Sequence, residues 1–498
     1  MLPKKMGHLG PQTEALLTQA AYELESSVAA GLVTAWSLTL RTRTHEAVTL
    51  SAAYADEWIP NHPAPAAYGG AVAAAAAHPV FDLASLTKPL LAGLLLARGV
   101  PDASTMSELL LTKGVPETTL AHLMPEGMTL GSGMRLLDLF SHQSGLPGWR
   151  WFGRGLYNAD SKSIGSLATE TQRGSARCGP RMDEDRLDTF RRALVRSFLN
   201  SPNGLHLGPD AARPHVCYSD CGYYLLARFF ESPYWRDRAG WQGWAAALAS
   251  LNSNLGTSLA HASLTPEIAA RAVPFYRYTV VESEDPEQQL AATPSFGTCQ
   301  DTNANILANL QPPEPEVSTH AGLFGTSADT LRGLDALMAF VGRLRHSGSL
   351  SSLRNDRFCF CLDTPTGPTT TSGAPAEQWP ETFGHLGYTG TSMWAHEPSG
   401  ASWVLLTNRT SGRSMLRANP TPRLMLMSTP LGDTHGLRAN GESTFAALTA
   451  DDWEEERSRC TGLHAVLWNP SDIRPFADIG GLRRSLGKQY WGLMARPS

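Results

Sequence analysis

The chain has 498 residues, of which 42% are apolar and 17% charged, and its formal net charge is −5 at pH 7. This composition is typical of a globular protein with a sizeable core, built from two or three compact units or from one enzyme domain with large insertions. A slightly negative chain without a basic block has no electrostatic basis for binding nucleic acid, so we predict no nucleic-acid partner.

Neither a secretory signal nor a membrane span is indicated. Residues 1–17 contain two lysines but no continuous apolar segment, and the longest strongly apolar run, residues 89–100, is too short to cross a bilayer. The seven cysteines include no C-x-x-C pair, which disfavours a zinc site or a disulfide framework. We expect reduced thiols and a cytoplasmic location, although a mature secreted chain that has lost its signal would look the same.

In chain order, the first predicted element is a helix near residues 14–30. Two β-rich runs follow, at 33–40 and 45–54, and the polar residues between them predict a hairpin. The long middle, roughly 100–375, mixes short helical patterns with loops rich in glycine, proline and serine.

One helix in that middle is well defined by its sequence. Residues 329–344 have a helical pattern, Thr326 and Asp329 can form a capping box at its start, and Gly348 follows its end.

Strand patterns return only late, within residues 385–408. If they pair with the strands of 33–54, the fold class is α+β, with an antiparallel β-sheet flanked by helices and a large, mostly helical insertion. We therefore predict three parts: an N-terminal segment or helix (1–27), a central domain (28–412) with the insertion at about 100–375, and a C-terminal extension (413–498) to which no function is assigned.

The stretch FDLASLTKPLLAGLLLARGV, residues 81–100, places Ser85 and Lys88 before an apolar run. On a helix, residues i and i+3 share a face, so the Lys88 amine could reach the Ser85 hydroxyl and activate it as a nucleophile. The start of a helix also offers free N–H groups to an oxyanion. The same residues are also explained if Ser85 and Lys88 are only the polar start of a buried helix, and S-x-x-K recurs at 485–488. This motif alone therefore does not identify a nucleophile.

Further motifs follow in order: LLDLFSHQSGLPGW at 136–149, Tyr218-Ser219-Asp220, CQDTNAN at 299–305, STHAGLFGTSADTL at 318–331 and His385-Leu386-Gly387. The ordered set resembles the serine β-lactamase and penicillin-binding-protein superfamily, in the branch of class C β-lactamases, D-Ala-D-Ala peptidases and esterases, whose members carry S-x-x-K, Y-x-N and K-T-G or H-x-G. The resemblance covers roughly residues 28–412 and implies a β-lactamase/transpeptidase-like fold.

The resemblance also implies roles for individual residues. Ser85 would be the nucleophile of an acyl-enzyme, and the backbone amides of Ser85 and Tyr388 would form its oxyanion hole. Lys88 and Tyr218 would move the proton; which of them is the base stays open, because the titration belongs to the pair. His385 stands where many relatives carry lysine. A neutral His385 could donate to the tyrosine oxygen, and a protonated one would add charge and make activity pH-sensitive.

Two departures from the family pattern bear on the substrate. Asp220 replaces an asparagine; its carboxylate would either keep Lys88 protonated and shift the base role to Tyr218, or cap a turn. Leu386 replaces a hydroxyl residue that helps to bind the substrate carboxylate in some members, which favours esters or amides without that group unless Leu386 faces the core. We predict that Asp220, Leu386 and Gly387 contribute to substrate binding.

These features predict a cofactor-independent serine hydrolase that acts on a small-molecule ester or amide, with esterase as the favoured activity. A D-Ala-type carboxypeptidase, a class C-like β-lactamase and an acyltransferase are alternatives within the superfamily. A non-catalytic peptidoglycan-binding or scaffold relative is an alternative of another class, and the retained serine, lysine and tyrosine count against it. His142, His320 and Asn303 are expected to brace turns and loops, and no metal site is predicted.

Overall fold

The structure is a computed structural model that describes residues 11–29, 33–42, 47–53, 79–150, 152, 183–200, 216–262, 264, 266–269, 271–273, 275–280, 290–295, 297, 299–310, 316–365, 372–409 and 474–495. The turn of the predicted hairpin and most of the predicted C-terminal extension lie outside these residues, as do Cys178 and Cys460. The remaining five cysteines are free thiols.

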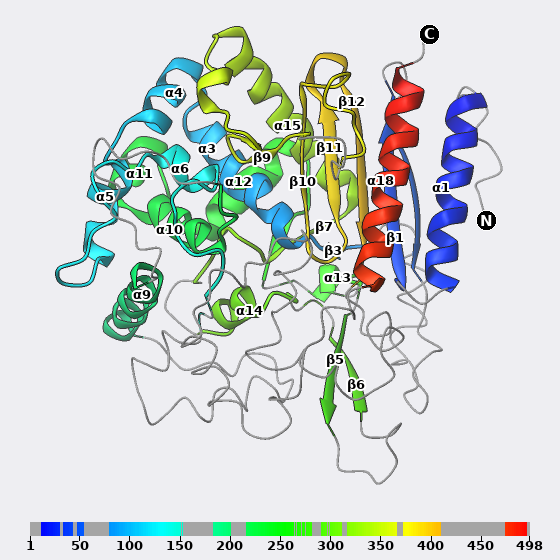
Figure 1. Cartoon of the computed structure of the whole chain (residues 1–498). Coiled ribbons are helices and arrows are strands. Elements are labelled where there is room, and N and C mark those ends of the chain that lie inside the picture. Colours follow the sequence, from blue (N-terminus) through cyan, green and yellow to red (C-terminus); the bar gives the residue numbers. More distant parts are fainter. Residues whose placement is uncertain are drawn as a thin grey trace.

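Within the described residues, an antiparallel sheet of seven strands has the order β2-β1-β12-β11-β10-β9-β8 (Figure 1). Its strands are β1 (Ala35–Arg41), β2 (Val48–Ala53), β8 (Phe358–Cys359), β9 (Leu362–Asp363), β10 (Thr382–Leu386), β11 (Ser392–His396) and β12 (Ala401–Thr407). β1 pairs with β12, with Trp36 opposite Thr407. The predicted pairing of early and late strands is therefore confirmed, and with it the α+β class.

Two smaller sheets accompany it: β3 (Phe81–Asp82), β7 (Leu323–Gly325) and β4 (Ala260–His261) form one, and β5 (Phe275–Val280) and β6 (Leu290–Ser295) the other. The helices are α1 (Pro11–Ala29), α3 (Leu94–Gly99), α4 (Ala103–Leu111), α5 (Val115–Thr119), α6 (Leu136–Phe140), α9 (Glu184–Leu199), α10 (Asp220–Glu231), α11 (Pro233–Ala239), α12 (Trp244–Leu255), α13 (Pro266–Ala269), α14 (Thr302–Asn309), α15 (Ser327–His346) and α18 (Arg474–Met494).

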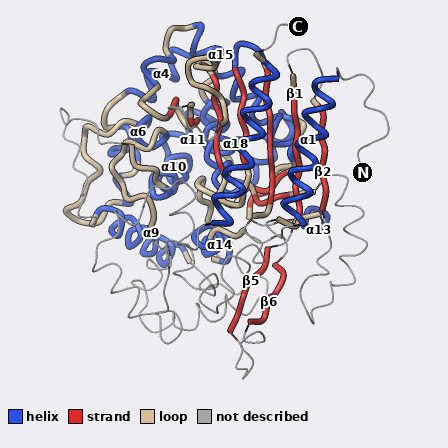
Figure 2. Tube along the Cα trace, turned by 45° about the vertical axis from the view of Figure 1, so that its right-hand side comes forward, coloured by secondary structure: helices blue, strands red, loops and turns tan. Residues whose placement is uncertain are grey.

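Both faces of the large sheet are covered. Helices α1 and α18 contact each other and run side by side over one face (Figure 2), where an outer cluster forms from residues such as Trp36, Trp403 and Trp491. On the opposite face α15 contacts β1, β11 and β12, and residues such as Val404 and Leu406 join the main core. Since strand neighbours point to opposite faces, a sheet covered on both sides requires apolar residues at successive positions, as in the WVLL of β12.

Helix α15 begins and ends as its sequence indicates. Thr326 is the N-cap, and its hydroxyl accepts a hydrogen bond from the Asp329 amide while the Asp329 carboxylate accepts one from the Thr326 amide. Gly348 follows the helix with φ +74°, a left-handed conformation that glycine adopts without strain. The predicted capping box is confirmed.

The helical segment expected around Ser85 and Lys88 is present, but it is not a single regular α-helix. A 3₁₀ turn (Ala84–Leu86) is followed by a π-helical segment (Lys88–Gly93) and then by α3. A proline ring inside an α-helix clashes with the carbonyl four residues earlier, which here belongs to Ser85, and the wider π turn avoids that contact at Pro89.

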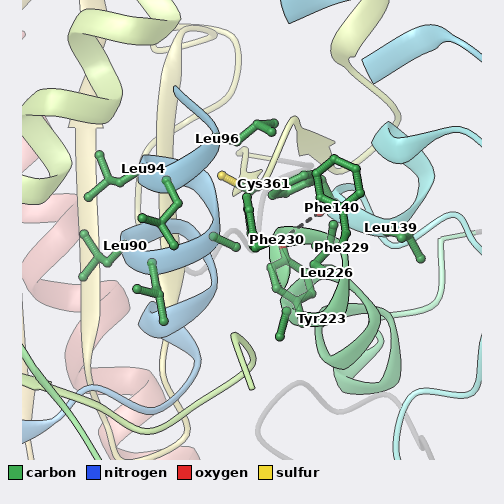
Figure 3. Packing of buried hydrophobic residues seen from close by; sticks show 14 of the residues in the cluster. Leu90, Leu94, Leu96, Leu139, Phe140, Tyr223, Leu226, Phe229, Phe230 and Cys361 are labelled. Atoms are coloured by element: carbon green, nitrogen blue, oxygen red, sulfur yellow. Dashed lines mark hydrogen bonds between the residues drawn. The ribbon is translucent and has the colours of Figure 1, made fainter. Parts of the chain in front are cut away.

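This helical run is buried on several sides. Figure 3 shows Leu90 and Leu94 on one side of it and Tyr223, Leu226 and Phe230 of α10 on the other. A Cβ atom added at Gly93 would lie 2.6 Å from the Cys361 sulfur, so the helix approaches its neighbours closely there. The packing fixes the segment that carries Ser85 and Lys88.

A buried ionic network ties α10 to residues 316–320. Arg228 of α10 contacts the Glu316 carboxylate and donates to the Val317 carbonyl at 2.5 Å, and Arg191 of α9 donates to Glu316 at 2.6 Å. Burial alone would raise the pKa of Glu316, but Arg228 and Arg191 lower it to about 2. The network stabilises two segments that, as described below, meet at Lys88.

Replacing Glu316 by glutamine should destabilise the protein by about 3 kcal/mol, because it removes one of the two carboxylates that pair with Arg191 and Arg228 and leaves both guanidinium groups with Glu231. Denaturant unfolding measures this, with the exposed Glu126→Gln as control. In the wild type the stabilisation should be present above the unfolded-state pKa of about 4.5 and be lost as pH falls toward about 2. A loss in Glu316→Gln no larger than in the control would contradict this account.

Candidate active site

Ser85 follows a residue in an unusual backbone conformation. Ala84 has φ +46°, a region that residues with a side chain rarely adopt. Its amide donates to the Asp82 carboxylate at 2.9 Å, and its carbonyl accepts from the Thr87 hydroxyl at 2.6 Å. Held from both sides, Ala84 turns the chain sharply out of β3 and leaves Ser85 partly exposed at the end of the turn.

Lys88 is fully buried, and its ammonium nitrogen lies close to oxygen atoms from three segments of the chain. Its Nζ atom lies 3.1 Å from Ser85 Oγ, 3.0 Å from the His320 carbonyl oxygen and 2.6 Å from Asp220 Oδ1. Burial would lower the pKa of Lys88, but the Asp220 carboxylate raises it above its ordinary value of 10.5. The raised pKa keeps Lys88 as an ammonium, so it holds no free lone pair in this state.

Tyr218 lies immediately before α10, whose N-cap is Ser219. Lys88 Nζ is 4.7 Å from the centre of the Tyr218 ring. Burial and the Asp220 carboxylate raise the pKa of Tyr218, whereas the Lys88 charge and hydrogen bonds with Lys88 and Ser85 lower it, and the net direction is upward from 10.0. The sequence-predicted serine, lysine, tyrosine and aspartate therefore meet at one place.

The structure distinguishes between the two predicted roles of Asp220. Its carboxylate forms the ion pair with Lys88, while the Ser219 hydroxyl accepts the capping hydrogen bond from the Gly222 amide. Asp220 therefore holds Lys88 in the protonated form, and the capping alternative falls to Ser219.

His385 is also buried in this region, with its ring centre 6.0 Å from that of Tyr218. Burial first, and then the Lys88 charge, lower the pKa of His385 to about 3, so the ring is neutral near pH 7. Its Nδ1 lies 2.8 Å from the Leu386 carbonyl, which can only accept. The hydrogen therefore sits on Nδ1 and Nε2 is an acceptor. This geometry favours neither of the two expectations for His385, donation to the tyrosine and a pH-sensitive charge.

The side chains of Leu386 and His385 point to opposite faces of the large sheet. It packs with the outer cluster beneath α1 and α18, whereas Phe383, two residues before His385 on the same strand, belongs to the main core. Neighbours on a strand point to opposite faces. The predicted use of Leu386 in substrate binding is therefore replaced by the alternative, a packing role.

Gly387 begins the turn between β10 and β11, which contains Tyr388. A side chain at Gly387 would overlap the Thr391 hydroxyl, so the turn requires glycine. The Thr389 hydroxyl donates to the Asp82 carbonyl at 2.7 Å, and the Thr391 hydroxyl donates to the Leu83 carbonyl at 3.1 Å. These bonds join the turn to the strand that leads into Ser85, and so place the two segments of the expected oxyanion hole next to each other.

His142 is more closely tied to the site than its sequence context indicated. It has φ +60° and its carbonyl accepts from the Cys217 amide, which agrees with the predicted turn role. Its ring also stacks on Tyr218 at 4.3 Å between centres, and its Nδ1 accepts from the Ser219 amide at 2.9 Å. The motif HQSGLP identified the turn, but only the fold shows that the turn supports Tyr218.

His320 and Asn303 brace loops as predicted. His320 Nε2 pairs with Asp301 at 2.9 Å, which fixes the segment whose carbonyl holds Lys88. The Asn303 amide donates to the Arg150 carbonyl and its oxygen accepts from the Phe152 amide, each at 2.8 Å.

Over the described ranges, no group of three or more histidine, cysteine, aspartate or glutamate side chains is placed to hold a metal ion. Nor does any helix found there have the length and apolar character to cross a membrane.

The sequence profile of the Beta-lactamase family matches residues 64–424, which is most of the chain. The chain belongs to the Beta-lactamase family. This membership confirms the superfamily resemblance and makes the protein a member of a serine hydrolase family with the β-lactamase fold. No curated protein matches the chain significantly.

Several solved structures are similar to this family member in fold. D-amino acid amidase from Ochrobactrum anthropi SV3 is 17% identical, covering 79% of this chain and 92% of its own, with a TM-score of 0.45. EstCE1, a hydrolase with promiscuous acyltransferase activity, is 14% identical, covering 85% and 98%, with a TM-score of 0.46. A penicillin-binding protein homologue from Caulobacter crescentus is 16% identical, covering 87% and 98%, with a TM-score of 0.46.

Replacing Asp220 by asparagine should lower the apparent pKa at which kcat/KM rises with pH. The carboxylate raises the pKa of both Lys88 and Tyr218, so without it both groups lose their protons at lower pH. Rates of hydrolysis from about pH 6 to about pH 11, which spans the ordinary pKa values of histidine and lysine, test this. The exposed Asp356→Asn serves as the matched control. An unchanged or higher apparent pKa in Asp220→Asn would count against the assignment.

Proposed function

We propose that the protein is a serine hydrolase that forms an acyl-enzyme on Ser85 and acts on esters that carry no carboxylate near the reacting carbonyl. The observation that supports this most directly is the contact between Lys88 Nζ and Ser85 Oγ, with Asp220 and Tyr218 beside it. The catalytic assignments of Ser85, Lys88, Tyr218 and Tyr388 are part of this proposal.

The ion pair between Lys88 and Asp220 favours Tyr218 as the base, because a lysine ammonium has no lone pair with which to accept the serine proton. Lys88 donates to the Ser85 oxygen, which leaves the serine hydrogen free to point at the Tyr218 oxygen. In the reactive form Tyr218 is ionised, and the Lys88 ammonium stabilises that phenolate. Ser85 Oγ attacks the ester carbonyl as its proton passes to Tyr218, and the developing oxyanion is held by the Ser85 and Tyr388 amides.

The second half of the cycle uses the same groups. Tyr218 returns the proton to the departing alkoxide, which leaves an acyl-Ser85 ester and a free alcohol. Water then attacks the acyl carbon, gives its proton to Tyr218, and the carboxylic acid leaves as the proton returns to Ser85. Each step conserves protons and needs no metal or cofactor.

The charges of the site favour an uncharged substrate. Lys88 is neutralised by Asp220, and His385, which replaces the lysine of many relatives, is neutral. An incoming carboxylate would thus meet no net positive charge from these three groups, and the partly exposed Asp220 carboxylate would repel it. Penicillins and D-Ala-D-Ala termini carry such a carboxylate, so the charges favour the esterase over its peptidase and β-lactamase alternatives.

Two matched substrates test both parts of the proposal. The kcat/KM for p-nitrophenyl butyrate should exceed that for mono-p-nitrophenyl succinate by about tenfold or more, which corresponds to about 1.4 kcal/mol. Ser85→Ala should abolish both activities and the mass increase that a fluorophosphonate gives on Ser85. Intact-mass and peptide mapping after fluorophosphonate or penicillin treatment show where each reagent attaches.

Two results would contradict the proposal. If Ser85→Ala hydrolyses the esters as fast as the wild type, the nucleophile is wrong. If penicillin labels Ser85 rapidly and esters are turned over poorly, the substrate class is wrong and a peptidase or β-lactamase is favoured.

A further inference from the structure

Helix α18 lies outside the residues that the family profile matches, yet it is firmly attached to the sheet. The Tyr490 hydroxyl donates to the Ser402 carbonyl at 3.1 Å, and the Trp491 indole donates to the Ser372 carbonyl at 3.0 Å. A side chain at Gly487 would overlap the Ser372 carbonyl, so helix and loop are in direct backbone contact. These contacts fix the position of α18 along the sheet.

One residue of α18 does not fit a helix that merely covers an apolar surface. Arg483 is 4% exposed, and its Nη1 donates to the Thr391 carbonyl at 3.2 Å. Burial, and then the nearby charge of Arg409, lower the pKa of Arg483 well below its ordinary value. Burying a guanidinium beside another one is unfavourable, and a leucine would cover the sheet better.

The group that Arg483 binds belongs to the Tyr388 turn. The Thr391 carbonyl also accepts from the Gly387 amide at 2.7 Å, which closes the turn around Tyr388. Arg409, two residues after the end of β12, donates through its Nε to the Tyr388 carbonyl at 2.7 Å. Two buried arginines therefore hold carbonyls of one short turn, while the Thr391 hydroxyl joins that turn to Leu83, two residues before Ser85.

We propose that Arg483 is a positioning residue that holds the Tyr388 amide in place for the oxyanion, so that α18 is part of the catalytic unit. This inference rests on the proposed acyl-enzyme mechanism. The charge of the oxyanion develops mainly in the transition state, so a displaced amide slows the chemical step and leaves substrate binding nearly unchanged. Arg483 acts through the turn and contacts neither Ser85 nor the substrate.

Three variants at neighbouring positions test the proposal. Arg483→Gln removes the charge and shortens the side chain, Arg483→Lys retains the charge, and Arg484→Gln changes the next residue, which is exposed. We measure kcat and KM for p-nitrophenyl butyrate, with kcat calculated per Ser85 site that reacts to completion with a fluorophosphonate. Unfolded molecules, which do not react with the fluorophosphonate, are then not counted in kcat.

The expected result is a fall in kcat of about tenfold to a hundredfold in Arg483→Gln, with KM within about twofold, since the loss of a whole oxyanion donor costs about a hundredfold to a thousandfold. Arg483→Lys should recover part of the loss, and Arg484→Gln should match the wild type. An unchanged kcat in Arg483→Gln, a change in KM alone, or an equal fall in Arg484→Gln would overturn the proposal. If the wild type itself is not labelled on Ser85, the proposed function fails instead.

Discussion

A lysine ammonium buried without any exposure can be stable only if all its N–H groups are accepted, and this requirement organises the site. Lys88 donates to Ser85 on its own helical segment and to the His320 carbonyl, 232 residues away in sequence, and it forms an ion pair with Asp220 at the start of α10. The Glu316 network then holds α10 against the segment that ends in His320. The charge of one side chain thus brings three distant parts of the chain together.

The structure distributes charge unevenly around Ser85 and the Tyr388 turn. In front, Lys88 and Asp220 cancel, and burial keeps His385 neutral. Behind the Tyr388 turn, Arg409 and Arg483 are both buried and donate to backbone carbonyls. In the proposed mechanism the oxyanion is held by neutral backbone amides, whose spacing the Tyr388 turn sets, and α18 contacts that turn through Arg483.

The sequence predicted those features that depend on nearby residues or on ordered motifs. The pairing of β1 with β12, the capping box at Thr326 and the meeting of Ser85, Lys88 and Tyr218 are all present. Features set by three-dimensional surroundings were left open or missed. The charge of His385 depends on how deeply it is buried, and the side of the sheet that Leu386 faces depends on β10's register. Arg483 could not be recognised, because nothing in the sequence of α18 shows which carbonyl it will reach.

The central claim is that Lys88 is an ammonium in the resting enzyme and that Tyr218 is therefore the base. Its most direct test is the chemical shift of the Lys88 Cε carbon, measured by NMR on protein labelled with ¹³C-lysine and assigned with Lys88→Arg. The account predicts that the signal keeps its ammonium value as pH rises past the ordinary lysine pKa of 10.5. A neutral amine at about pH 7, well below the ordinary lysine pKa, would contradict the account and make Lys88 the base.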